Sequence, residues 1–460
     1  MMRLVTVGMG LSLWCVALNA QSPALPSGRT AYRTLDEVNA ELLSLATAHP
    51  TRVRRFALAN PSVTGQTVWA LEVAARVTEP SGRPVFLMTG LHHAREWPTV
   101  ELSLELVHDV LARDGADSTI TRLLDAVRLI VVPVVNPDGY VLSRSMKVEQ
   151  KRKNCRLEGV AQPTLEACGA PEAVNAGVDL NRNYGAFWGA GGASPNALAQ
   201  NYRGPSPFSE PEIRNIRDLM ASEPVVIALS NHTPDAKVLR VPSAAEEPVP
   251  ADVVVYDSLA QALGTDLKWD AGPWPKVYYV ASGTMEEQGY YSAGTLAFTF
   301  EHAPGQRSFH PPYSFVVDQY HGTGAYPGSS ARAAFLRLYA AAADARLHSV
   351  LDVQAPAGAT LTLTKSFELQ TAGVLRADSS RAPAIPLPTT LRATMVVPRG
   401  RNAVVWHVNP SVRPSQQAQA FIDERWTVSC VLGTDRASAE VRVERGARAA
   451  VDLRACGRGR

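Results

Sequence analysis

The sequence VFLMTGLHHAREW, residues 85–97, joins an apolar run to two side chains that can bind a metal. Its first five residues read as a buried strand, and Gly90 marks the end of that strand. His93 and Glu96 lie three positions apart, so one turn of chain can aim both at a single ion. Ligands of open α/β sheets bind beyond the carboxyl ends of the strands, and zinc accepts nitrogen and oxygen ligands. A catalytic zinc site also needs a third protein ligand, which another part of the chain has to supply.

Strand-like and helix-like segments alternate on both sides of this stretch. Short apolar runs that stop at polar residues predict further strands at 129–135, 225–230 and 296–300, and helical spacing predicts helices at 33–48, 99–112 and 331–350. Thr34 and Glu37 have the spacing of a capping box at the start of the first of these helices. Such alternation predicts an α/β fold with helices on both faces of the sheet.

The C-terminal part of the chain has a different pattern. After a linker at residues 354–358 the helical spacing stops, and short strand-like runs between turn residues predict a small all-β sandwich. At 460 residues the chain is also too long for one compact domain of common size. We therefore expect a signal peptide at residues 1–20, an α/β domain at 21–351 and a C-terminal β-sandwich accessory domain at 352–460.

The N-terminus reads as a secretion signal. Arg3 gives a positive start, residues 4–17 are apolar, and Ala20 offers a small residue for cleavage. No later apolar run is long enough to cross a bilayer. The formal net charge of +2 and the scattered basic residues do not indicate a nucleic-acid partner. We expect a secreted protein, extracellular or periplasmic.

The cysteines fit an exported protein. Cys15 would leave with the signal, and the remaining four lie in two local groups, Cys155 with Cys168 and Cys430 with Cys456. Two local disulfides are the simplest of the three possible connectivities, and the second would staple the sandwich. The alternative is a zinc site built from these thiols, which the absence of CxxC spacing disfavours.

Several predicted strands end at residues with metal-binding or acid–base chemistry. His93 and Glu96 follow the strand at 85–89, His232 follows the run at 225–230, and Glu301 directly follows the run at 296–300. A lone histidine at a strand end is usually a structural residue, but two histidines and two carboxylates at three strand ends are hard to explain in that way. His232 is therefore the natural third metal ligand.

At this point the chain resembles the zinc metallocarboxypeptidases of the pancreatic carboxypeptidase A/B type. The resemblance rests on separate motifs in the family's order: YRTLDE at 32–37, GLHHAREW at 90–97, NPDGY at 136–140, GVDLNRN at 177–183, ASGT at 281–284 and FTFE at 298–301. It implies the zinc carboxypeptidase fold, a mixed twisted sheet with helices on both faces, and one Zn²⁺ in the catalytic domain.

The resemblance assigns the metal centre residue by residue. His93, Glu96 and His232 would hold the zinc; His92 is the other candidate in the doublet, and the family pattern favours His93. Asp179 matches the carboxylate that fixes the tautomer of a ligating histidine, with a simple turn or cap residue as the alternative. Glu301 matches the general base, which takes a proton from the zinc-activated water.

Other matched residues would bind a substrate that ends in a free carboxylate. Arg182 would grip the carboxylate bidentately, Asn181 would add a hydrogen bond, and Tyr279 would close over the site. Arg152 would stabilise the oxyanion, although Lys151 stands where the family usually has an aromatic residue. The alternative for these polar groups is a solvated surface position.

The remaining assignments concern secondary contacts and specificity. Arg95 resembles a secondary substrate-binding arginine. Glu286 occupies the position that sets the floor of the specificity pocket, where an acid goes with Lys or Arg and apolar residues go with hydrophobic C-termini. Basic preference is only slightly favoured, because the following Glu287-Gln288 departs from the family's usual Asp-Trp; the alternative is that Glu286 faces solvent. His302, His310 and His321 lie in a Pro/Gly-rich stretch and are expected at the surface.

The resulting hypothesis is a secreted zinc exopeptidase that removes single residues from the C-termini of peptides and proteins. A relative that hydrolyses cell-wall peptides or amides is the alternative enzyme, and the presence of Arg182, Asn181 and Tyr279 disfavours it. A non-catalytic peptide-binding protein would be expected to lack a metal ligand or the base, and all four are present. The sandwich is expected to contact an unknown partner or a glycan, or only to stabilise the enzyme.

Overall fold

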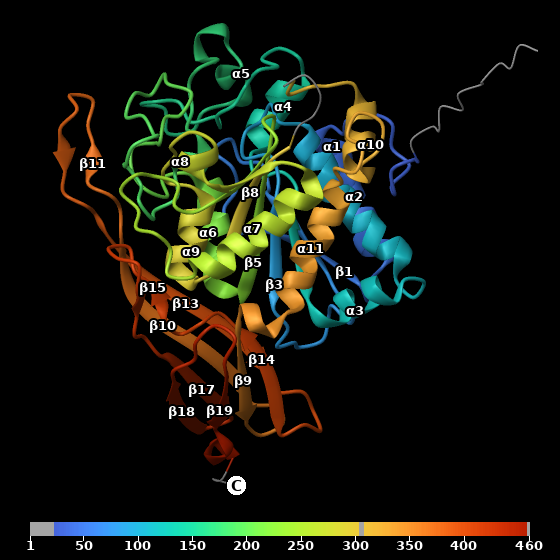
Figure 1. Ribbon diagram of the computed structural model, residues 1–460, viewed down its shortest axis with the longest axis vertical. Coiled ribbons are helices and arrows are strands. Elements are labelled where there is room, and N and C mark those ends of the chain that lie inside the picture. The colour runs from blue at the N-terminus through green and yellow to red at the C-terminus, as the bar shows by residue number, and fades with distance from the viewer. Residues whose placement is uncertain (1–22, 303–307, 458–460) are drawn as a thin grey trace, which may run out of the picture.

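The computed structural model describes residues 23–302 and 308–457, which form a body of sheet and helices joined to a set of C-terminal β-sheets (Figure 1). The expected signal peptide and Cys15 lie outside the described residues. None of the helices in these two ranges combines the length and apolarity needed to span a bilayer.

The body is built on an eight-stranded mixed sheet with the strand order β1-β2-β4-β3-β5-β8-β6-β7. Its strands are β1 Val53–Ala57, β2 Trp69–Val73, β3 Val85–Thr89, β4 Arg128–Val132, β5 Val225–His232, β6 Lys237–Arg240, β7 Asp270–Pro273 and β8 Leu296–Glu301. The neighbours β4, β3, β5 and β8 run parallel, so their carboxyl ends lie at one edge of the sheet. Every residue of β3, β5 and β8 is buried, as expected for strands covered on both faces.

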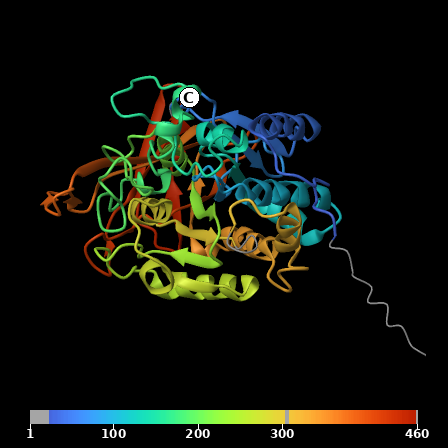
Figure 2. The same ribbon diagram turned by 90° about the horizontal axis from the view of Figure 1, so that it is seen from above.

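Helices cover both faces of this sheet (Figure 2). The longer ones are α1 Leu35–Ala48, α2 Pro98–Arg113, α3 Ser118–Ala126, α4 Pro137–Arg144, α6 Pro211–Ser222, α7 Val253–Leu267, α9 Met285–Ala293, α10 Tyr313–His321 and α11 Ala331–Ala343; α5 Leu165–Cys168 and α8 Trp274–Val277 are single turns. Apolar residues of α1, α2, α3, α7, α10 and α11 share one core with one face of the strands, while those of α6 pack on the other face. The predicted α/β class is confirmed, and the predicted capping box at Thr34 and Glu37 starts α1.

The C-terminal part consists of two facing sheets. One has the order β13-β10-β17-β18 and the other the order β14-β9-β19. Their strands are β9 Ser349–Gln354, β10 Thr360–Gln370, β13 Pro386–Val396, β14 Ala403–Val408, β17 Trp426–Leu432, β18 Asp435–Val441 and β19 Arg448–Asp452, and two short ribbons pair β11 Val374–Leu375 with β12 Arg381–Ala382 and β15 Arg413–Pro414 with β16 Phe421–Ile422. A separate apolar core that includes Trp406, Trp426 and Val428 lies between the two sheets.

Two details of the chain differ from the predicted elements. The closing helix α11 ends at Ala343, whereas the sequence predicted a helix to residue 350. Residues Ser349–Gln354 form strand β9, which pairs with β14, and this strand includes the expected end of the helix and the expected start of the linker. Both predicted disulfides, Cys155–Cys168 and Cys430–Cys456, are present.

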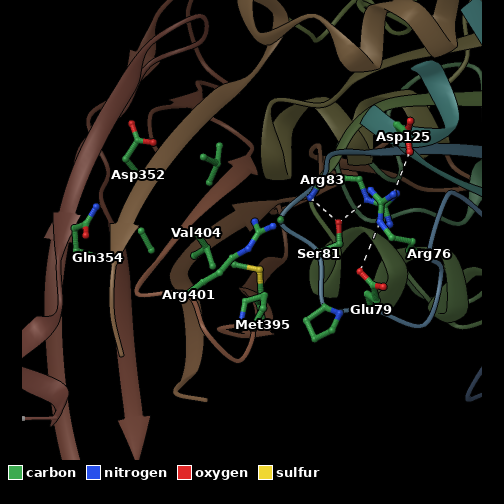
Figure 3. Close-up of a pocket in the computed structure, with 15 residues that line it drawn as sticks. Arg76, Glu79, Ser81, Arg83, Asp125, Asp352, Gln354, Met395, Arg401 and Val404 are labelled. Atoms are coloured by element: carbon green, nitrogen blue, oxygen red, sulfur yellow. Dashed lines mark hydrogen bonds and ion pairs between the residues drawn. The ribbon is translucent and has the colours of Figure 1, made fainter. Parts of the chain in front are cut away.

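The sandwich packs directly against the α/β body. Arg445 and Asp252 form a buried ion pair of 2.8 Å across the contact, and the Asn409 side-chain amide donates to the Val225 carbonyl at 2.7 Å. Near β14, the His407 amide donates to the Gly82 carbonyl at 2.7 Å, beside a crevice of about 430 Å³ lined by residues from both parts, including Arg83 and Arg401 (Figure 3).

Candidate metal centre and active site

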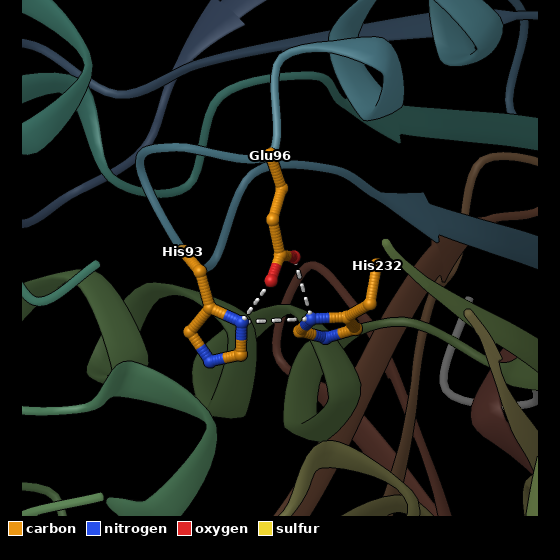
Figure 4. Close-up of side chains that lie close together, drawn as sticks. All are labelled: His93, Glu96 and His232. Atoms are coloured by element: carbon orange, nitrogen blue, oxygen red, sulfur yellow. Dashed lines mark hydrogen bonds and ion pairs between the residues drawn. The ribbon is translucent and has the colours of Figure 1, made fainter. Parts of the chain in front are cut away.

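Three potential ligands meet at the carboxyl edge of the central strands. His93 and Glu96 lie in the loop between β3 and α2, and His232 is the last residue of β5, which neighbours β3. His93 Nδ1 lies 2.8 Å from a Glu96 oxygen and 3.1 Å from His232 Nδ1, which lies 3.0 Å from the second Glu96 oxygen (Figure 4). Among the described residues, this is the one group of histidine, cysteine and acidic side chains with metal-ligand spacing.

The partners of the two imidazoles decide whether this group fits a cation. His93 Nε2 lies 3.0 Å from an oxygen of Asp179, and a carboxylate accepts hydrogen bonds, so we assign the His93 proton to Nε2. His232 Nε2 lies 2.9 Å from the Ser230 hydroxyl oxygen, which can accept a hydrogen bond from an Nε2–H group. The two Nδ1 lone pairs and the Glu96 carboxylate then converge without a proton between them. Three such donors fit zinc, which binds imidazole nitrogen and carboxylate oxygen.

The electrostatics keep these side chains in their ligand forms. Burial lowers the pKa of His232 to about 4, so its imidazole is neutral at neutral pH. Burial alone would raise the pKa of Asp179, but neighbouring groups hold it well below the usual range. The main one is Arg152, whose guanidinium donates to Asp179 at 2.8 and 3.1 Å.

Glu301 lies beside the three ligands, and its pKa is shifted in the opposite direction to that of Asp179. It ends β8 directly opposite His232 of β5 and is 4% exposed. Its pKa is raised well above the ordinary value by burial and by the nearby Glu96 and Asp235 carboxylates. One of its oxygens has no hydrogen-bond partner among the described residues. A buried carboxylate with a raised pKa can take up a proton more readily than an ordinary glutamate.

One pocket of about 390 Å³ brings most of the predicted site residues together. Its lining includes Arg95, Glu96, Arg152, Arg182, Tyr279 and Glu301. The Arg182 guanidinium lies 3.4 Å from the Tyr279 hydroxyl, and backbone carbonyls of Asn181 and Gly192 accept from its other nitrogens. Tyr279 is 43% exposed at the pocket mouth. A carboxylate entering this pocket would meet a guanidinium that is already oriented.

Two predicted substrate-binding residues lie outside this lining. Asn181 is buried; its side-chain oxygen accepts from the Met285 amide, and its nitrogen lies 3.4 Å from His232 Nε2. Glu286, in the first turn of α9, is also fully buried. One Glu286 oxygen accepts from the Trp274 indole at 3.2 Å, and the other has no partner among the described residues.

The pocket also contains residues that sequence reasoning missed. Asp235 lies three positions after His232, and its carboxylate accepts from the Tyr278 hydroxyl. Phe309 lies 4.2 Å from the Arg95 guanidinium, measured to its ring centre. The position of Asp235 just beyond a ligand-bearing strand could have identified it, whereas no local pattern identifies Phe309.

Comparisons with known proteins agree with this geometry. The family described as zinc carboxypeptidase matches residues 38–323, more than half of the chain, and the protein belongs to this family. The family uses Zn²⁺, and this chain carries a His–Glu–His group that could hold the ion.

Among curated relatives, carboxypeptidase A2 of Mus musculus is 30% identical over 277 residues, which cover 59% of this chain and 62% of the relative. Carboxypeptidase A1 of Mus musculus is 29% identical over 295 residues, with 62% of this chain and 66% of the relative covered. The chain thus spans slightly less than two thirds of the length of these relatives.

Solved structures show the same fold. Thrombin activatable fibrinolysis inhibitor aligns with a TM-score of 0.59 at 23% identity, covering 69% of this chain and 76% of that one. Carboxypeptidase A from Helicoverpa armigera aligns with a TM-score of 0.58 at 24% identity, covering 70% and 77%.

Proposed function

We propose that this protein is a zinc-dependent metallocarboxypeptidase that hydrolyses the C-terminal peptide bond of peptides and proteins. The observation that carries the proposal is the shared pocket, whose lining includes the metal-group residue Glu96, the buried carboxylate Glu301 and the oriented Arg182. When bound by His93, Glu96 and His232, zinc supplies a Lewis acid that polarises the scissile carbonyl and acidifies water.

In this proposal Glu301 carries the proton. Its carboxylate accepts a proton from the attacking water as the carbon–oxygen bond forms. It then delivers that proton to the amine nitrogen as the carbon–nitrogen bond breaks. The raised pKa of Glu301 supports the second role, because it favours retention of the proton between the two steps.

The arginines and Tyr279 hold the substrate. Arg182 pairs with the terminal carboxylate, and the Tyr279 hydroxyl lies near enough to share it, which restricts cleavage to the last peptide bond. Arg152 stabilises negative charge on the carbonyl oxygen, while its bonds to Asp179 fix its direction. Arg95, over the Phe309 ring, contacts residues further from the cleaved bond.

We also propose a preference for basic C-terminal residues, set by Glu286. The support is one buried Glu286 oxygen that has no hydrogen-bond partner among the described residues, because a Lys or Arg side chain would supply one. Trp274 occupies the other oxygen, and burial raises the pKa of Glu286. A protonated Glu286 would instead favour apolar residues.

The proposed location is outside the cytoplasm, extracellular or periplasmic, with a signal peptide at residues 1–20, the catalytic domain at 21–351 and the sandwich at 352–460. Two disulfides support it, because such bonds persist in oxidising compartments.

The experiment that tests the proposal is hydrolysis of blocked dipeptides ending in Arg, Lys, Phe, Leu or Glu. Each is offered as the free acid and as the C-terminal amide. Release from the acids and none from the amides is expected, with Arg and Lys fastest. Equal cleavage of acids and amides would contradict the role of Arg182.

A further inference from the structure

We propose that a hairpin arm of the β-sandwich positions the carboxylate-binding side of the active-site pocket. The arm is residues 371–385, which connect β10 to β13 and contain β11 and β12. It extends away from the sandwich and runs alongside the α/β body (Figures 1 and 2). The contacts of the arm do not depend on the proposed function, whereas the expected change in enzyme kinetics rests on it.

The arm is bonded to the loop that follows Arg182, residues 185–192. The Ala372 amide donates to the Trp188 carbonyl at 3.2 Å, and the Leu375 amide donates to the Gly189 carbonyl at 2.9 Å. Val374 is buried against Gly189, at which an added Cβ would lie 3.1 Å from the Val374 side chain. Gly189 also has a φ of +85°, so close backbone approach and left-handed geometry both require glycine there.

Two polar contacts strengthen this attachment. The buried Arg203 donates to the Leu375 carbonyl at 2.6 Å, and its guanidinium lies 4.7 Å from the centre of the Trp188 ring. Arg381 donates to a Glu246 oxygen at 2.6 Å, and that oxygen also accepts from the Gly191 amide at 3.3 Å. The arm, the loop and the segment that carries Glu246 are therefore held together.

The C-terminal end of the loop lies in the pocket lining. Gly192 lines the pocket, and its carbonyl accepts from Arg182 Nε at 3.3 Å. A Cβ at Gly192 would lie 2.2 Å from the Val280 carbonyl, so the loop rests on the residue that follows Tyr279. The Ser282 hydroxyl donates to the Ala190 carbonyl at 3.2 Å.

The loop is thus enclosed between the arm and the chain that carries Tyr279. A shift of the loop would move the carbonyl that orients Arg182 and the surface that supports Tyr279. Neither contact involves Glu301 or the metal ligands. Loss of the arm should therefore weaken binding of the terminal carboxylate and leave the chemical step nearly unchanged.

The test uses the full chain with the arm replaced by an Asn-Gly turn. This turn can join Gln370 to Pro386, which already pair across β10 and β13. Val374→Asp and Arg381→Ala probe the same contacts without a deletion, and Val374→Ile is the conservative control. Arg448→Ala removes an exposed ion pair with Asp352 elsewhere on the sandwich and serves as the matched control.

Two measurements are made on each variant: kcat and KM for a blocked dipeptide acid, and hydrogen exchange of backbone amides in residues 186–192. We expect the arm replacement and Val374→Asp to raise KM about three- to tenfold with kcat changed less than about twofold. We expect faster exchange in the loop for both variants, a smaller effect of Arg381→Ala, and neither effect in the two controls.

Unchanged KM and unchanged loop exchange in the arm replacement would overturn the proposal, as would a fall in kcat at constant KM. If the unaltered chain hydrolyses no dipeptide, the proposed function fails, and the exchange measurement still decides whether the arm holds the loop. Should the arm replacement fail to fold, Val374→Asp decides by the same criteria.

Discussion

Glu301 and Asp179 are both buried carboxylates within the same site, yet their surroundings shift their pKa values in opposite directions. Asp179 accepts two hydrogen bonds from Arg152 and one from His93, so its charged form is stabilised. Burial raises the pKa of Glu301, and the nearby Glu96 carboxylate raises it further. In the proposed mechanism these opposed shifts separate an ionised carboxylate, Asp179, which orients His93, from Glu301, which exchanges a proton.

Replacing Glu301 by Gln tests this assignment. The amide keeps the size of the side chain but cannot accept the proton, so kcat should fall about 10²- to 10⁴-fold. Zinc content, measured by elemental analysis, should stay at the level of the unaltered chain, because Glu301 is not one of the three ligands. Retained activity in a zinc-loaded Glu301→Gln variant would remove Glu301 from the mechanism.

At the scale of elements, the order and direction of the strands bring the site residues together. Because β3, β5 and β8 are parallel neighbours, residues that follow each strand meet at one edge. That is why the sequence could predict the grouping of His93, Glu96, His232 and Glu301 from apolar runs that stop at polar residues. Site residues that lie on loops, such as Arg152, were predicted from the family motifs and not from the spacing of residues.

Other features of the elements could not be predicted locally. His302 was expected at the surface and is fully buried, with its ring nitrogen 2.8 Å from the Asn231 side-chain oxygen. That prediction is wrong because burial of His302 depends on α7, α11 and their loops, which pack over β8 from distant parts of the sequence. The start of strand β9 was expected to be helical for a similar reason. Its pairing with β14 and β19 overrides the local helical preference of the sequence.

The junction of α1 and α2 depends on one buried arginine. Arg33 is fully buried and pairs with Glu41, Glu101 and Glu105. Arg33→Met leaves the buried Glu101 and Glu105 without their cation, and we expect a loss of about 3–5 kcal/mol in the free energy of unfolding, measured by urea denaturation. Arg29→Met removes the exposed pair with Glu37 and should cost less than about 1 kcal/mol. Equal losses in the two variants would contradict this account.

The same junction predicts a pH dependence of stability. Burial alone would raise the pKa of Glu41, but hydrogen bonds from His108 and Arg33 lower it to about 2. Because the unfolded value is about 4.3, the folded state binds fewer protons between these limits. The stabilisation is therefore complete above about pH 4.3 and is lost as the pH falls towards 2.

Unfolding free energies at several pH values in this window should show a shallower acid loss for Glu41→Gln than for the unaltered chain. Parallel curves would show that Glu41 is not the responsible group.

At the scale of the whole molecule, the sandwich is part of the catalytic architecture. It contributes Arg445 to a buried ion pair with Asp252 of the body, and its hairpin arm is hydrogen-bonded to the loop that ends at Gly192 in the pocket lining. Sequence patterns indicated an all-β region after residue 351 and its disulfide, but the arm is two short strands with no distinctive composition. Its placement depends on contacts made with residues far away in the chain, so only the folded structure reveals it.

The central claim is that one zinc ion, bound by His93, Glu96 and His232, makes this protein a carboxypeptidase. The measurement is a titration of chelator-stripped protein with zinc while release of the C-terminal residue from a blocked dipeptide is followed. Release should be absent in the stripped protein and rise to a plateau at one zinc per chain, and Glu96→Gln should need more zinc to reach its plateau. Release that survives complete removal of the metal, or a folded and zinc-loaded protein that releases nothing, would contradict the claim.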